Sequence, residues 1–346
     1  MKKKRMFWIF SVFVLIAIIS GSLIIKSLTT TSYGKLDTMF GVMTKIEKYF
    51  NPISLKGKSI YEIRAALHKD TTKWSSKPIT FSNIKNMDIK TSSNQVPVRI
   101  YTPDNGNKFP LIIYSHGGSW IGGNLDDYDN VCRKLSKNSK AIVVSVNYRL
   151  APENPFPAGL NDVYNVLLWV YKNAKSINGD SSRICVAGDS AGGNLSAAVS
   201  QMARDEAGPH ITSVVLIYPS TNIYKLHTKS WSYFGMDYNP TRENSERFIS
   251  LYTPRLEDRK SNYASPLLYK NFKGLPDTLI ITAEFDPLRD EGESYGNELR
   301  NAGVDVISTR YKGVIHGFVS MDNITEKADQ ALNEISTYLQ RQFNKS

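Results

Sequence analysis

The stretch Gly188-Asp189-Ser190-Ala191-Gly192-Gly193 decides the fold of this chain. It follows an apolar run at 183–188 and precedes a helical pattern at 191–205, so Ser190 lies in a turn between a strand and a helix. A serine in a Gly-x-Ser-x-Gly turn of this kind exposes its hydroxyl at the strand end, because the glycines let strand and helix approach closely. We therefore expect Ser190 to be a catalytic nucleophile.

Short apolar runs alternate with helical patterns on both sides of this turn. The first two predicted strands lie at 79–90 and 95–102, and the apolar runs that follow lie at 110–115, 141–147, 183–188, 212–218, 278–283 and 304–311. The helical patterns lie near 126–138, 159–175, 191–205, 290–302 and 324–342. Continuous apolar strands separated by helices are typical of a parallel sheet covered by helices on both faces. We predict an α/β fold with a mostly parallel central sheet, whose first two strands form an antiparallel pair.

A serine hydroxyl is a weak nucleophile at neutral pH and needs an adjacent base. Of the five histidines, His316 follows the last strand, at the sheet edge where parallel strands end and active sites lie. Asp286 follows the strand at 278–283 and is the acid we expect to orient His316; Asp290, one turn into the next helix, is the rival. The chain order Ser, Asp, His is that of α/β-hydrolases.

The negative oxygen that forms during attack on an ester needs hydrogen-bond donors held in place beforehand. The stretch Ser115-His116-Gly117-Gly118-Ser119-Trp120 follows an earlier parallel strand and offers backbone without side chains there. We expect the N–H groups of Gly117, Gly118 and Ala191 to form this oxyanion hole. His116, next to two glycines, is expected to brace the loop.

Five spaced motifs together resemble the hormone-sensitive-lipase-like family of α/β-hydrolases. They are His116-Gly117-Gly118, Tyr148-Arg149-Leu150-Ala151-Pro152-Glu153 with Pro155-Phe156-Pro157-Ala158, Gly188-Asp189-Ser190-Ala191-Gly192-Gly193, Asp286-Pro287-Leu288-Arg289-Asp290 and His316-Gly317-Phe318. The resemblance covers about residues 75–345, and five motifs in order make it highly specific.

The resemblance implies an α/β-hydrolase fold with a helical cap, built from the N-terminal helices and the insertion after the sixth strand. It implies a serine carboxylesterase that hydrolyses short-chain, acetyl-type esters through an acyl-enzyme intermediate and needs no cofactor. The residues that it assigns are Ser190, Asp286 and His316 as the triad, and Gly117, Gly118 and Ala191 as the oxyanion donors.

Three other functions share part of this pattern. Chymotrypsin-like proteases also have Gly-Asp-Ser around their nucleophile, but they are all-β proteins with the chain order His, Asp, Ser, so the alternating strands and helices exclude them. A non-catalytic binding protein on this fold, as in the plant gibberellin receptors, is disfavoured because all three triad positions are filled. An amidase or deacetylase of cell-envelope or xenobiotic substrates would use the same triad, and the sequence leaves it open.

The N-terminus has the composition of a membrane segment. Residues 6–25 carry no charge, and a helix of that length spans about 30 Å, the thickness of a bilayer's hydrocarbon core. The four basic residues at 2–5 place the N-terminus in the cytoplasm and the rest of the chain outside. A cleaved signal peptide usually has a shorter apolar core, and Ser20-Gly21-Ser22 is a weak cleavage site. We expect a single-pass anchor, an architecture that resembles arylacetamide deacetylases.

Charge and cysteine content limit the partners. The formal net charge is +11, of which the first 26 residues supply five, and the remaining +6 is scattered without a dense basic stripe. We therefore expect no nucleic-acid partner. Cys132 and Cys185 are too few for a disulfide framework and are expected to be core thiols. Without Cys-x-x-Cys or His-Glu-x-x-His spacing, no metal site is expected.

These observations divide the chain into three parts. We expect a membrane anchor at 1–26, a helical cap segment at 27–75 with helices near 36–50 and 58–69, and a catalytic domain at 76–346. Within the catalytic domain, the long aromatic-rich connection at about 219–263, with a helix near 241–253, is expected to complete the cap. The expected partners are a small acyl-ester substrate and a membrane; the sequence leaves open the physiological substrate and the oligomeric state.

Overall fold

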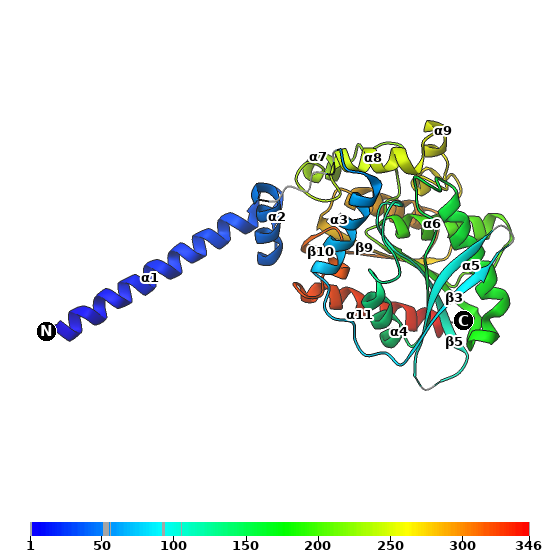
Figure 1. The fold of residues 1–346 in the computed structure, drawn as a ribbon, viewed down its shortest axis with the longest axis horizontal. Coiled ribbons are helices and arrows are strands. Elements are labelled where there is room, and N and C mark those ends of the chain that lie inside the picture. Colours follow the sequence, from blue (N-terminus) through cyan, green and yellow to red (C-terminus); the bar gives the residue numbers. More distant parts are fainter. Residues whose placement is uncertain (1, 51–54, 56, 92–93, 105, 346) are drawn as a thin grey trace.

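The computed structural model describes residues 2–50, 55, 57–91, 94–104 and 106–345. Its centre is an eight-stranded sheet with the strand order β10-β9-β8-β7-β5-β6-β4-β3 (Figure 1). The strands are β3 (Asn83–Lys90), β4 (Gln95–Thr102), β5 (Phe109–Ser115), β6 (Ile142–Val146), β7 (Gly179–Asp189), β8 (Ser213–Ile217), β9 (Asp277–Phe285) and β10 (Val306–Ile315).

The strand pairing confirms the predicted mostly parallel sheet. β3 pairs antiparallel with β4, and β4 pairs antiparallel with β6. The other five neighbouring pairs are all parallel. β5, β7, β9 and β10 therefore end at one edge of the sheet, where the sequence places the candidate site residues.

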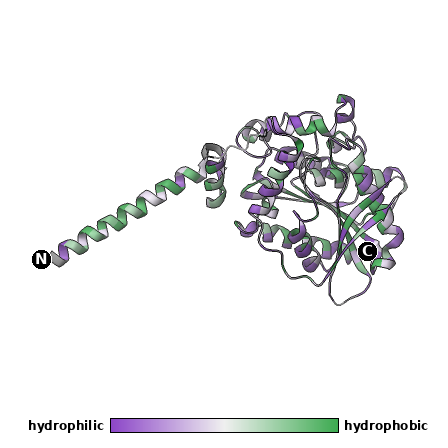
Figure 2. Ribbon diagram, viewed as in Figure 1, coloured by the Kyte–Doolittle hydropathy of each residue, from purple (hydrophilic) through white to green (hydrophobic). Residues whose placement is uncertain are grey.

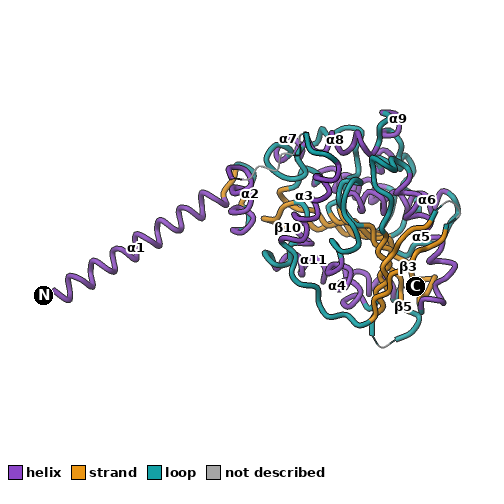
Figure 3. The backbone as a smooth tube through the Cα atoms, in the orientation of Figure 1, coloured by secondary structure: helices purple, strands orange, loops and turns teal. Residues whose placement is uncertain are grey.

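Helices cover both faces of this sheet, as predicted. They are α4 (Asp129–Ser139), α5 (Ala158–Asn173), α6 (Ala191–Asp205), α10 (Arg289–Asn301) and α11 (Glu326–Phe343) (Figure 3). Alternate residues of β5 belong to two separate apolar cores, because successive side chains of a strand point to opposite faces. Leu111 and Ile113 pack with side chains of α5, α6 and α10, whereas Ile112 and Tyr114 pack with side chains of α4 and α11.

The N-terminal segment begins with a long apolar helix. α1 (Lys2–Thr29) extends away from the body, is hydrophobic along most of its length, and is followed by a short hairpin of β1 (Thr30–Thr31) and β2 (Gly34–Lys35) (Figures 1 and 2). α1 is long and apolar enough to cross a membrane, and its apolar window has no surface buried against the rest of the protein. A membrane anchor and a signal sequence both have these properties. Two further helices follow, α2 (Thr38–Phe50) and α3 (Ile60–Lys73).

The long connection after β8 is mostly irregular and contains three short helices. They are α7 (Lys229–Phe234), α8 (Arg242–Tyr252) and α9 (Leu256–Arg259). The sequence predicts α8 but not α7 or α9, which are too short to show a helical period. Single 3₁₀ turns occur at Ala174–Ile177, Pro266–Leu268 and Phe318–Ser320.

Candidate active site

Ser190 occupies a strained turn between β7 and α6. Its backbone has φ 53° and ψ −116°, a conformation that non-glycine residues rarely adopt. The surrounding backbone is packed so tightly that a Cβ on Gly192 would lie 1.9 Å from the Ser115 carbonyl oxygen. A Cβ on Gly188 would lie 2.4 Å from the Gly192 carbonyl oxygen. Both positions therefore require glycine, which gives the sequence motif its physical reason.

His316 connects the serine to a buried carboxylate. Its Nε2 lies 2.9 Å from Ser190 Oγ, and its Nδ1 lies 2.8 Å from Asp286 Oδ2. The other carboxylate oxygen, Oδ1, accepts a hydrogen bond from the Leu288 N–H at 2.8 Å, which fixes the carboxylate plane. The Asp286 side chain is fully buried, whereas that of His316 keeps 12% of its surface exposed. Both distances are those of hydrogen bonds, so a proton can pass between Ser190 and His316.

Asp290, the rival acid, is engaged elsewhere. Its Oδ2 accepts a hydrogen bond from the Ser230 N–H at 2.8 Å, and its Oδ1 forms an ion pair with Arg289 at 2.9 Å. It therefore caps the first turn of α7. Of the two candidate carboxylates, Asp286 is the one that the structure brings to His316.

The loop after β5 places one predicted oxyanion donor differently from the prediction. The Gly117 N–H donates to Asp189 Oδ1 at 2.9 Å, so it is not available to a substrate oxygen, and the prediction for this residue is wrong. The backbone of Gly118 and Ser119 has positive φ, 116° and 54°, and both residues line the cavity at Ser190. Within the described part of the chain, the N–H groups of Gly118, Ser119 and Ala191 donate to no protein acceptor. The Ser119 N–H therefore lies free beside that of Gly118 in the wall of this cavity.

The Asp189 carboxylate joins the oxyanion loop to the nucleophile turn. Asp189 directly precedes Ser190 in the chain, and its side chain is buried. It accepts hydrogen bonds from the Gly117 N–H at 2.9 Å and from the Tyr114 hydroxyl at 2.8 Å. Burial raises the pKa of Asp189 to about 6, although the hydrogen bonds from these two donors lower it. No sequence signal separates this structural carboxylate from the other residues of the motif, because its partners come from another strand.

His116 braces the same loop, as its position beside two glycines predicts. Its ring is fully buried between the rings of Tyr128 and Tyr148, with centroid distances of 5.7 and 4.4 Å. Its Nδ1 lies 2.7 Å from the Gly117 carbonyl oxygen. Burial lowers the pKa of His116 to about 4, so it is a neutral ring at physiological pH.

Two hollows meet at Ser190. The larger, about 160 Å³, is lined by Ser190 and His316 and by residues of α2, α3 and the connection after β8, among them Met43, Leu67 and Tyr238. The smaller, about 20 Å³, has largely apolar walls. These walls include Trp120, Leu226, Trp231, Phe248, Ile249 and Leu288. Ser190 therefore lies between a larger hollow and a smaller one.

A buried glutamate that the sequence did not predict holds the connection after β8 in place. Glu291, on α10, accepts hydrogen bonds from the Trp231 indole N–H and the Thr221 N–H, both at 2.9 Å, and from the Asn222 N–H at 3.2 Å. The pKa of Glu291 is raised from 4.5 to about 7, and burial is the largest cause of this rise. Nothing in the local sequence marks this residue, because its partners lie about 60 positions or more away.

This raised pKa predicts a pH dependence of stability. Between pH 4.5 and 7 the folded protein retains a proton on Glu291 that the unfolded chain has lost, so the free energy of unfolding should decrease as pH rises through this interval. Glu291→Gln replaces the titrating carboxyl group by an amide, so the free energy of unfolding should change less with pH in this interval. The variant should also be less stable than the parent protein, because an amide N–H₂ would then face the Trp231 N–H. Thermal unfolding midpoints measured across this interval test the prediction. Glu298→Gln, an exposed change on the same helix, is the control; equal pH slopes for Glu291→Gln and the parent would contradict it.

The described residues contain no group of three or more His, Cys, Asp or Glu side chains placed to hold a metal ion. Cys132 and Cys185 are both free and buried. Burial raises the pKa of Cys185 to about 12, and that of Cys132 is also raised, so both stay as thiols. Their positions agree with the predicted core role.

Comparison with known proteins shows the same architecture. Residues 112–320 match the family described as alpha/beta hydrolase fold. Carboxylesterase NlhH of Mycobacterium tuberculosis is 41% identical over 243 residues, which are 68% of this chain and 75% of that protein. An ethyl acetate hydrolase of Pseudomonas putida is 33% identical over 265 residues, covering 75% of this chain and 82% of that protein.

Among solved structures, an esterase of Pyrobaculum calidifontis superposes with a TM-score of 0.80 at 36% identity, covering 87% of this chain and 97% of that one. The family match spans more than half of the chain, and the sequence motifs, the strand order and the comparisons agree. The chain belongs to the hormone-sensitive-lipase-like family of α/β-hydrolases.

Proposed function

We propose that this protein is a serine carboxylesterase that hydrolyses short-chain, acetyl-type esters. The observation that supports it best is the position of His316, within hydrogen-bond distance of both Ser190 and Asp286 at the edge of the sheet where β7, β9 and β10 end. The names of the relatives, carboxylesterase and ethyl acetate hydrolase, support the same reaction.

In this mechanism His316 accepts the Ser190 proton while Ser190 Oγ attacks the ester carbonyl carbon. The negative oxygen then accepts hydrogen bonds from the free N–H groups of Gly118, Ser119 and Ala191. His316 returns the proton to the alcohol oxygen as the C–O bond breaks, which leaves an acyl group on Ser190. His316 next deprotonates a water molecule, whose attack releases the carboxylic acid and restores the serine.

The narrow side of Ser190 supports the preference for short acyl groups. The hollow of about 20 Å³ accommodates little more than a methyl group, and its walls include Trp120, Leu226 and Trp231. A longer acyl chain would have to displace these side chains, and in a packed interior such displacement is costly. We assign the acyl group to this hollow and the alcohol to the larger one.

A panel of p-nitrophenyl esters tests this assignment. We expect kcat/KM to be highest for acetate and propionate and to fall by about tenfold or more at hexanoate, since one methylene changes discrimination by roughly 1–3 kcal/mol. Leu226→Ala should raise the hexanoate-to-acetate ratio by about tenfold, because it widens the narrow hollow. Leu256→Ala, the same change at a side chain that is 56% exposed, is the control. An unchanged ratio in Leu226→Ala would place the acyl group elsewhere.

We also propose that α1 remains attached as a membrane anchor, with the catalytic domain on the far side of the membrane from the basic N-terminus. Its apolar window with no buried surface and the four preceding basic residues support this orientation. The mass of the mature chain, purified from membranes, should correspond to the intact N-terminus. Loss of about the first 22–32 residues would show that α1 is a signal sequence.

A further inference from the structure

The junction between α1 and the body is folded rather than flexible. Thr29, the last residue of α1, is fully buried, and its carbonyl oxygen accepts a hydrogen bond from the Leu36 N–H at 2.9 Å. The six residues between them form the β1–β2 hairpin. The chain therefore enters the body within a few residues of the apolar span.

This junction packs against the strand ends that carry the proposed acid and base. The Asp37 N–H donates to the Gly313 carbonyl oxygen at 2.9 Å, three positions before His316, and its carboxylate forms an ion pair with Lys327 at 2.7 Å. The buried side chains Leu36, Phe40 and Met43 belong to the same apolar core as Phe285 and Ile315, which directly precede Asp286 and His316. These contacts hold the start of α2 on the body, and the buried Thr29 joins α1 to this segment through its hydrogen bond with Leu36.

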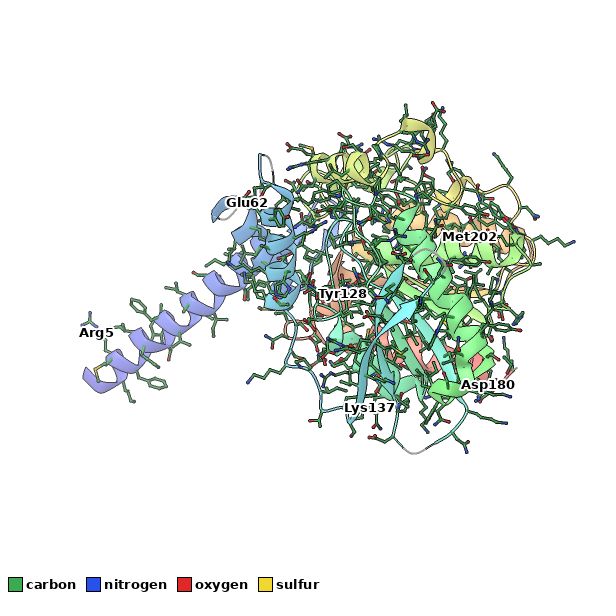
Figure 4. All side chains as sticks on the ribbon, turned by 45° about the vertical axis from the view of Figure 1, so that its right-hand side comes forward. Arg5, Glu62, Tyr128, Lys137, Asp180 and Met202 are labelled. Carbon is green, nitrogen blue, oxygen red and sulfur yellow. The ribbon has the colours of Figure 1, made fainter. Side chains whose placement is uncertain are left out.

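α2 also forms one wall of the large hollow at Ser190. Met43, Thr44 and Glu47 line this hollow together with Asp237 and Tyr238 of the connection after β8. In the ribbon view α2 lies across the end of α1, between α1 and the body (Figure 1). The hollow is therefore at the end of the body that α1 joins, whereas Arg5 lies at the far tip of α1 (Figure 4).

Exposed apolar side chains gather around this junction. Outside α1, eight large hydrophobic side chains of the described residues are exposed, and five of them come from the hairpin, α2, α7 and the turn that follows α7. These five, which we call the junction patch, are Tyr33 (46% exposed), Met39 (48%), Ile46 (51%), Tyr233 (40%) and Met236 (80%). Tyr33 stacks on Tyr233 with ring centroids 4.6 Å apart, which joins the hairpin to α7.

The position of the junction patch identifies what covers it. The hairpin and α2, which carry three residues of the patch, directly follow the apolar helix α1. In an anchored protein the patch therefore lies at the level where the bilayer's headgroups begin. Tyrosine is enriched at this level because its ring is apolar and its hydroxyl is polar. Ile46 and Met236 are chain neighbours of Glu47 and Asp237, two residues that line the hollow. The patch therefore lies next to two residues of the wall of the hollow.

We propose that the catalytic domain lies on the bilayer surface in a fixed orientation, with the junction patch in the headgroup layer, and that it takes amphiphilic esters directly from the bilayer into the Ser190 hollow. This inference rests on the proposed esterase activity and on retention of α1.

Activity on an embedded substrate tests the inference. The full chain is reconstituted in vesicles of phosphatidylglycerol and phosphatidylethanolamine in equal parts that contain 3-acetyl-1,2-dioleoylglycerol, and acetate release is measured. The double variant Ile46→Asp, Met236→Asp should lose about tenfold or more of this rate while its hydrolysis of soluble p-nitrophenyl acetate stays within about twofold. Tyr171→Asp, at a side chain 45% exposed on α5, should lose neither activity.

A second variant tests the orientation without changing the patch. A glycine–serine linker of about 12 residues inserted after Lys26 spans about 20 Å, so it lets the domain leave the bilayer surface while Thr29 and the hairpin stay intact. It should also lose embedded-substrate activity selectively. Full embedded-substrate activity in both the patch and the linker variants would overturn the inference. Failure of the parent protein on p-nitrophenyl acetate would instead refute the proposed esterase.

The depth of the patch can be measured directly. Met236→Cys and Leu256→Cys offer single exposed thiols for an environment-sensitive fluorophore, because Cys132 and Cys185 are buried. Leu256 lies on α9, on a part of the body away from α1 (Figure 1). The emission of the label at position 236 should shift to the blue in vesicles, and that of the label at 256 should not. Equal emission at both positions would show that the patch does not contact lipid.

Discussion

Replacing Ser190 with alanine should lower kcat for p-nitrophenyl acetate by roughly 10⁶-fold, the scale on which a serine hydrolase depends on its nucleophile. The change removes one oxygen whose hydrogen-bond partner is His316 Nε2 at 2.9 Å, and it alters no buried apolar contact. The thermal unfolding midpoint should therefore stay within a few degrees of the parent value.

Covalent labelling provides an independent readout of the same serine. A fluorophosphonate should label the folded parent protein once and leave Ser190→Ala unlabelled, because the reagent needs an activated hydroxyl. Labelling of the alanine variant at another residue, with activity retained, would mean that the nucleophile has been misassigned. An unlabelled, inactive but folded parent would favour a non-catalytic binding role.

The change Asp286→Asn has the second-largest expected effect. In a serine protease triad the corresponding change lowers kcat by about 10⁴-fold, because an amide in place of the carboxylate stabilises the wrong tautomer of the histidine. Here the Asp286 carboxylate lies 2.8 Å from His316 Nδ1 and has its other oxygen fixed by the Leu288 N–H. An amide of the same size would keep one of these two hydrogen bonds and lose the charge that stabilises the imidazolium.

Asp290→Asn is the matched control for this prediction. Asp290 lies four residues further along, caps α7 through the Ser230 N–H and pairs with Arg289. Its substitution should cost about 1 kcal/mol of stability and change kcat by only a few-fold. A steady-state comparison of the two variants assigns the acid. If Asp290→Asn caused the larger loss, His316 would have a different partner in the working enzyme.

The sequence predicted the features that depend on local pattern. Segment patterns gave every strand of the central sheet and the main helices. The signal is clearest in β5, β6, β8 and β9, because these strands are buried on both faces. The strand-end positions of Ser190, Asp286 and His316 were visible for the same reason. Parallel strands end at a common edge, so residues far apart in the chain can be expected to meet there.

The features that it missed depend on contacts between distant segments. The hydrogen bond that occupies the Gly117 N–H was not predicted, because its acceptor, the Asp189 carboxylate, comes from another strand. Glu291 has no distinguishing neighbours in the sequence, although its four donors fix the connection after β8. Tertiary hydrogen bonds of this kind leave no periodic trace.

The packing of Leu36, Phe40 and Met43 also determines where the chain can be shortened for work in solution. The sequence divides the molecule at residues 26 and 75, but these three side chains complete the core beneath Phe285 and Ile315. A truncation that starts near residue 27 removes only the exposed apolar helix. One that starts at residue 76 would open a hydrophobic gap beside His316, so a soluble preparation made that way would aggregate before its activity could be measured.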